Sequence, residues 1–138
     1  MSDSGPDIAR FLTGVLRTRD TLHGVYNHYV RRGNKVHWGR NATGPIWAEF
    51  GYFEYGLMVT GSDGKNYELS ARLRWPGEKW IAEAEAAIEE EDAAGNWFYP
   101  TLRDLPKKES ENWEQALSDF SQAVASLKSF DDLIPTEN

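Results

Sequence analysis

The apolar positions of residues 6–32 recur three, four and seven residues apart, which is typical of one face of an α-helix. They are Ile8, Phe11, Leu12, Val15, Leu22, Tyr26 and Tyr29. Pro6 suits the first helical turn, whereas Arg31 followed by Gly33 suits the last turn and its end. The pattern therefore predicts one long helix over residues 6–32.

After residue 33 the period of the pattern shortens to two, as in a β-strand with one buried face. The clearest alternation has Tyr67, Leu69, Ala71, Leu73 and Trp75 on one side and Glu68, Ser70, Arg72 and Arg74 on the other. Residues 35–38 and 46–60 are also strand-like, and 61–64 is a hairpin turn signal. Because 46–60 is long for one strand, we expect a bulge at Gly51 or a break at 54–56.

Two further helices are predicted over residues 78–93 and from about Glu111 onward. The first is rich in alanine and glutamate, which favour helices, and Gly95 is its candidate C-terminal cap. The second follows a candidate N-cap, Ser110. Its apolar stripe is Trp113, Ala116, Leu117, Phe120, Ala123, Val124 and Leu127. We expect a loop over 96–106 and a C-terminal tail that folds back onto the body.

This order of elements predicts a single α+β domain over residues 1–138. It consists of a long N-terminal helix, an antiparallel meander of three to four strands, and two C-terminal helices packed on one sheet face. We expect loose ends at about 1–5 and 135–138.

Charge is divided unevenly along the chain. Residues 1–77 hold 10 Lys and Arg against 7 Asp and Glu, a net +3, whereas residues 78–138 hold 5 against 15, a net −10. The acidity is densest over residues 78–92, where seven carboxylates face one lysine. Such a surface repels nucleic acid and attracts basic partners, so we expect no nucleic-acid partner.

The chain has no cysteine, and its three histidines lack metal-ligand spacing. It contains no Gly-x-Ser-x-Gly motif, no Walker phosphate loop and no Gly-x-Gly-x-x-Gly motif. No apolar run approaches the length that spans a membrane, and no signal peptide is visible. We therefore expect a cytoplasmic protein with no membrane contact, no cofactor, no metal and no catalytic site.

The acids of the predicted second helix have three possible interpretations. They are a solvated helix face, a protein-binding face, or oxygen ligands for a divalent cation. The protein-binding interpretation takes in nearby aromatic residues, which are common interface anchors. Its candidate partner-binding residues are Glu83, Glu85, Glu89, Glu90, Asp92, Trp80, Trp97 and Tyr99.

In its acidic stretch over 83–92, its aromatic richness and its size, the chain resembles the small acidic immunity proteins that bacteria make against polymorphic toxins. The resemblance implies a protein-binding inhibitor that caps the basic active site of a cognate toxin. The alternative is a small-ligand-binding protein or enzyme with a pocket between the aromatic sheet and the helices. A homodimer through exposed aromatic residues is a further possibility.

Overall fold

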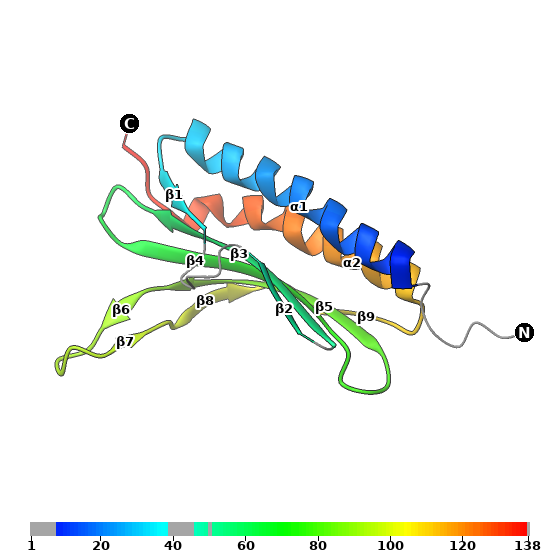
Figure 1. The fold of residues 1–138 in the computed structure, drawn as a ribbon. Coiled ribbons are helices and arrows are strands. Elements are labelled where there is room, and N and C mark those ends of the chain that lie inside the picture. The colour runs from blue at the N-terminus through cyan, green and yellow to red at the C-terminus, as the bar shows by residue number, and fades with distance from the viewer. Residues whose placement is uncertain (1–7, 39–45, 50, 138) are drawn as a thin grey trace, which may run out of the picture.

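The computed structural model describes residues 8–38, 46–49 and 51–137 of the 138-residue chain. The fold is α+β, as predicted: two helices lie side by side on one face of an antiparallel sheet, and the other sheet face is left uncovered by helices (Figure 1). Of the predicted loose ends, residues 1–5 lie outside the described residues, whereas residues 135–137 lie within them.

The long N-terminal helix is α1 (Ile8–Arg31), as the sequence pattern predicts. Its buried face includes Phe11, Val15, Leu22, Val25 and Tyr29. The helix ends where Gly33 adopts a φ of 92°, a left-handed conformation that glycine adopts without strain. The N–H of Gly33 then donates to the carbonyl of Val30 at 2.9 Å.

The large sheet has β3 (Tyr52–Thr60), β4 (Asn66–Arg74) and β5 (Trp80–Ile88) at its centre. Two short strands flank each side, and every pairing is antiparallel. On the β3 side they are β1 (Lys35–His37) and β2 (Ile46–Glu49). On the β5 side they are β8 (Thr101–Asp104) and β9 (Lys108–Ser110). A separate two-stranded sheet pairs β6 (Glu90–Glu91) with β7 (Trp97–Phe98).

The expected irregularity in residues 46–60 is a chain reversal. Glu49 pairs with Tyr52, so β2 and β3 form a hairpin, and Gly51 lies in its turn with a φ of 74°. The carbonyl of Gly51 accepts a hydrogen bond from the N–H of Trp75 at 2.8 Å. The predicted turn at 61–64 is confirmed, because the N–H of Gly64 donates to the carbonyl of Gly61 at 3.0 Å.

The prediction of a helix over residues 78–93 is wrong, because this segment forms β5 and β6. Its alanines at 82, 84 and 86 lie on the buried sheet face, and small side chains there let α2 (Trp113–Ala125) pack closely. Glu83 and Glu85 alternate with them on the open face, where they meet arginines of β4. Packing and ion pairing thus override a helix propensity worth only tenths of a kcal/mol per residue. The predicted loop at 96–106 likewise contains β7 and β8.

The C-terminal part has one α-helix rather than two. Asn112 caps α2, since its side-chain oxygen accepts from the N–H groups of Glu114 and Gln115, and Ser110 lies just before this cap. A 3₁₀ helix, η1 (Ser126–Leu133), follows α2. The tail then folds back as expected, and the carbonyl of Pro135 accepts from the N–H of Ser62 at 2.9 Å.

The helices α1 and α2 run in the same direction, because residues near the start of α1 contact the start of α2 and later residues contact later ones. Arg10 contacts Glu114 at the start of both helices, and farther along the hydroxyl oxygens of Thr21 and Ser121 lie 3.5 Å apart. The space between helices and sheet is filled by fully buried side chains. The largest are Tyr29, Tyr55, Phe120 and Phe130. This layer therefore forms the core of the fold.

Candidate functional site

The open face of the sheet carries two of the sequence-predicted residues, Glu83 and Glu85. They lie on β5 opposite Arg72 and Ser70 of β4, and Arg72 in turn lies opposite Glu54 of β3. Residues paired in this way across neighbouring strands share a face of the sheet. The acids of β5 therefore stand beside cations rather than on a continuous acidic surface.

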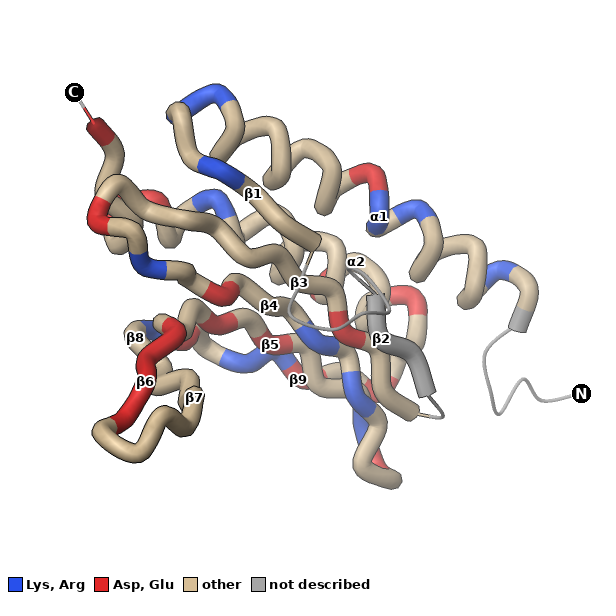
Figure 2. The backbone as a smooth tube through the Cα atoms, turned by 60° about the vertical axis from the view of Figure 1, so that its left-hand side comes forward, with Lys and Arg blue, Asp and Glu red and all other residues tan. Residues whose placement is uncertain are grey.

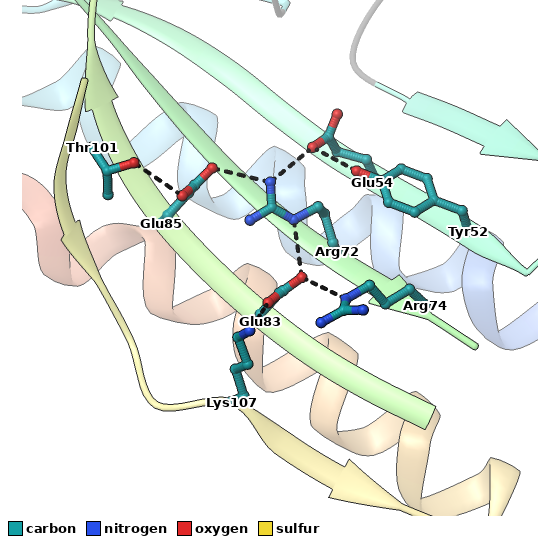
Figure 3. Close-up of polar contacts among 8 residues, drawn as sticks. All are labelled: Tyr52, Glu54, Arg72, Arg74, Glu83, Glu85, Thr101 and Lys107. Atoms are coloured by element: carbon teal, nitrogen blue, oxygen red, sulfur yellow. Dashed lines mark hydrogen bonds and ion pairs between the residues drawn. The ribbon is translucent and has the colours of Figure 1, made fainter. Parts of the chain in front are cut away.

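Arg72 is the centre of an ion-pair cluster on this face (Figure 3). Its guanidinium contacts Glu85 at 3.0 Å, Glu83 at 3.3 Å and Glu54 at 3.5 Å. Glu83 also accepts from Nε of Arg74 at 2.9 Å and lies 3.5 Å from Nζ of Lys107. Three carboxylates thus share three cations, and the cluster has no net charge.

The pKa values of the cluster follow from this pairing. Burial alone would lower the pKa of Arg72, but the hydrogen bond and charge of Glu85, with Glu83, raise it. Burial opposes the charge on Glu83, yet Arg74 and Arg72 hold the pKa of its carboxyl below its usual range. Burial and Glu54 raise the pKa of Tyr52 to about 12. Glu83 is therefore ionised at neutral pH, and the charges of Glu83 and Glu85 are both compensated by neighbouring cations, which suits structural residues.

Trp80, another predicted partner-binding residue, lies at the start of β5 and packs against the core. Its ring centroid is 5.1 Å from that of Phe11 and 5.0 Å from that of Trp75. Such aromatic pairs stabilise a fold beyond the area they bury. Neither Trp80 nor the two acids of β5 is grouped with the other predicted residues.

The remaining five predicted residues are brought together by a hairpin that we call the acidic arm, residues 89–99. Two strands of the arm, β6 and β7, project beyond the large sheet (Figure 1). At the tip, the side chain of Asp92 accepts from the N–H groups of Ala94 and Asn96, both at 2.9 Å, and Gly95 has a φ of 85°. These bonds lower the pKa of Asp92, with the N–H of Asn96 contributing most. The turn is therefore well ordered and keeps its negative charge.

The base of the arm is tied to the sheet by Glu89. One carboxylate oxygen accepts from the hydroxyl of Tyr99 at 2.9 Å, and the other accepts from Nδ2 of Asn66 at 3.1 Å. The N–H of Glu89 also donates to the carbonyl of Asn66 at 2.9 Å. Glu89 and Tyr99 thus fix the direction in which the arm projects. A preformed element loses less entropy when it binds a partner.

Each face of the arm presents one carboxylate and one aromatic ring. Glu90 lies opposite Phe98, and Glu91 lies opposite Trp97. The side chain of Glu90 is 3.7 Å from Nζ of Lys65, whereas Glu91 is exposed and makes no ion pair within the described residues. Trp97 is 58% exposed and Phe98 is 47% exposed. The face with Glu91 and Trp97 is consequently the more open one.

The charged residues of the arm are all acidic. Residues 89–99 contain four carboxylates and no lysine, arginine or histidine. Figure 2 shows the acids of β6 gathered on this projecting element, whereas acids and cations are intermixed on the strands of the large sheet. Among sites for a partner in the described residues, the arm alone combines concentrated negative charge with exposed aromatic rings.

Sequence reasoning missed Glu91 and Phe98 as members of this group. The signal that could have found them is the turn sequence Asp92-Ala-Ala-Gly-Asn96, set between an acidic and an aromatic segment. Read as a hairpin turn, it pairs the acids before it with the rings after it. The helix prediction concealed this pairing.

A cavity of about 550 Å³ lies elsewhere, between the first halves of α1 and α2. Its lining includes Arg10, Arg17, Trp113 and Leu117. It lies outside the layer between sheet and helices, where the alternative small-ligand hypothesis places its pocket. In that layer, fully buried side chains fill the space.

Within the described part of the chain, neither helix has the length and apolar character needed to cross a bilayer. No protein-family model, no curated protein and no solved structure matches this sequence.

Proposed function

We propose that this chain is a protein-binding inhibitor of the immunity-protein type, and that its acidic arm enters and caps the basic active site of a cognate toxin. The observation that carries the proposal is the pairing of exposed rings with carboxylates on a projecting, preformed hairpin that has no cation of its own. Trp97 and Phe98 are exposed beside Glu90 and Glu91, and no cation lies between residues 89 and 99.

The two kinds of side chain would have different tasks. Carboxylates on a projecting element attract a basic partner from a distance and raise the association rate. Aromatic rings that become buried in the complex slow its dissociation, since Trp and Tyr are frequent binding hot spots. Catalytic clefts that handle phosphate-bearing substrates are commonly basic, so an anionic arm with flat rings suits such a cleft.

The proposal moves the binding surface away from the open sheet face. Glu83 and Glu85 already contact Arg72, and Glu83 also contacts Arg74 and Lys107. A partner that used these acids would have to break ion pairs that the folded chain has formed. Glu90, Glu91, Trp97 and Phe98 require no such rearrangement, apart from the long contact of Glu90 with Lys65.

The test begins with capture of partners from lysate of the source organism by the tagged chain, followed by purification of the captured protein and an assay of its own activity. We expect an enzyme that is inhibited at one-to-one stoichiometry. The variant W97A/F98A should still associate but dissociate at least ten times faster, because roughly 1.4 kcal/mol of lost contact gives a tenfold change.

The matched control is V30A, which truncates an exposed apolar side chain of α1 that lies far along the chain from the arm. It should bind and inhibit as the unmodified chain does. Inhibition that survives W97A/F98A unchanged, or a captured protein whose activity the chain leaves untouched, would contradict the proposal.

A further inference from the structure

The exposed large apolar side chains of the described residues fall into two groups. One group lies on or next to the acidic arm and the other lies on α1. They are Trp97, Phe98 and Leu102 in the first group and Leu12, Leu16 and Val30 in the second. Two such groups on one small chain point to two separate contact surfaces.

The α1 group belongs to a cationic surface. The helix carries four arginines and one aspartate, a net charge of +3 with its histidines neutral. Leu12, Leu16 and Arg19 project from the same side at helical spacing, and all three are exposed. Arg17 and Arg19 make no ion pair within the described residues. We call Leu12, Leu16, Arg17 and Arg19 the α1 patch.

The α1 patch and the acidic arm complement each other in charge and in apolar character. One offers guanidinium groups beside leucine side chains, and the other offers carboxylates beside aromatic rings. Figure 1 places them on opposite sides of the sheet, so that the arm of one molecule cannot cover the patch of the same molecule. Contact between them therefore requires a second copy.

We infer that this chain associates with itself head to tail, with the acidic arm of one copy on the α1 patch of the next. Pairing of two acidic arms is disfavoured, because it would bring eight carboxylates together and neither arm contains a cation. A head-to-tail contact is heterologous, so it generates open chains or a closed ring rather than a simple two-fold dimer. Self-association of this kind needs no toxin and does not depend on the proposed function.

The test is sedimentation equilibrium of the purified chain over a range of concentrations, at about 0.05 M and about 0.5 M salt, since the higher salt screens charges a few ångströms apart. The average mass should rise with concentration above the monomer value of 15.7 kDa at low salt and fall toward it at high salt. The charge-reversal variants R17E/R19E and E90K/E91K should each weaken association roughly tenfold or more.

An equimolar mixture of these two variants gives the decisive measurement. The reversed patch of one variant complements the reversed arm of the other, and their unmodified surfaces also match. The mixture should therefore associate where each variant alone does not. The controls K35E/K128E and E78K/E137K make the same changes in net charge at other exposed residues and should behave as the unmodified chain.

A chain that stays monomeric at low salt up to about millimolar concentration, near the weakest affinity of interest, overturns the inference. So does a mixture that fails to associate, or association that R17E/R19E leaves intact. Binding of the monomer to vesicles of anionic phospholipid would instead assign the α1 patch to a lipid surface. None of these results depends on whether a toxin partner is found.

Discussion

Replacing Glu83 with glutamine tests whether the cluster on the open sheet face is structural. The substitution keeps the shape of the side chain and removes its charge. The side chain of Glu83 is only 12% exposed. Its Oε1 accepts a hydrogen bond from Nε of Arg74 at 2.9 Å and lies 3.3 Å from Nε of Arg72. Arg72 keeps Glu85 and Glu54 as partners, whereas Arg74 loses the one carboxylate it contacts among the described residues.

The expected cost follows from these contacts. Hydrogen bonds to charged groups contribute about 1.5–3 kcal/mol each, and breaking a buried ion pair costs roughly 3–5 kcal/mol. Because both arginines keep some contact with solvent, with 21% and 32% of their side chains exposed, the lower end applies. We expect E83Q to lower the free energy of unfolding by about 2 kcal/mol at pH 7. For a chain of this length the melting temperature should fall by roughly 7 °C.

The effect of E83Q should depend on pH in one direction. The pKa of Glu83 is lowered in the folded state, so its ionised form stabilises the fold above the ordinary glutamate pKa of about 4.3. That contribution disappears as the pH falls through the lowered pKa. The difference between E83Q and the unmodified chain should therefore shrink on acidification.

Urea unfolding at pH 7 and at progressively lower pH measures the loss of stability in E83Q and its dependence on pH. The matched control is E91Q, on the acidic arm, where the side chain is exposed and the expected change is below about 0.5 kcal/mol. Equal stability of E83Q and E91Q at pH 7, or a difference that grows toward acidic pH, would refute the structural assignment of this cluster.

Three further changes test the fold. Y55F removes the buried hydrogen bond from Tyr55 to the carbonyl of Val15 and should cost about 1 kcal/mol in unfolding free energy at pH 7. Burial raises the pKa of Tyr55 to about 12, so its contribution is complete below about pH 10 and lost as the pH rises from there; Y55F should flatten part of the alkaline decline followed by circular dichroism. N112A removes the cap of α2 and should lower stability in urea by about 1 kcal/mol, whereas no loss would contradict the cap. G51A places a side chain at a φ of 74° and 3.3 Å from the carbonyl of Trp75; a cost of about 1–2 kcal/mol is expected in thermal unfolding, and an unchanged melting temperature would argue against this turn.

Where the spacing of apolar residues is regular over a long segment, the structure has the predicted helix or strand. The stripe from Phe11 to Tyr29 became α1, and the alternation from Tyr67 to Leu73 became β4. Apart from the exposed Leu12, both patterns place their large apolar side chains on the side that faces the core, so burial and local propensity agree.

Residues 78–93 misled because their buried face consists mainly of alanine. Alanine is the best helix former, and the segment Glu83-Ala-Glu-Ala-Ala-Ile fits a helix almost as well as a strand. What decides the matter is distant in sequence: Arg72 and Arg74 of β4 pair with the glutamates, and α2 packs over the alanines. The sequence shows that this segment is rich in acidic and aromatic residues. Which acids pair with arginines on the sheet and which lie on the acidic arm depends on the strand register, which the sequence does not reveal.

We propose that the acidic arm, and not the open sheet face, contacts the partner protein. Site-specific photo-crosslinking tests it most directly, with benzoylphenylalanine placed at Phe98 on the arm or at Tyr52 on the open face, two aromatic positions of similar size. We expect a crosslinked one-to-one complex with the captured partner from position 98 and none from position 52. Crosslinking from position 52 without crosslinking from position 98 would contradict it.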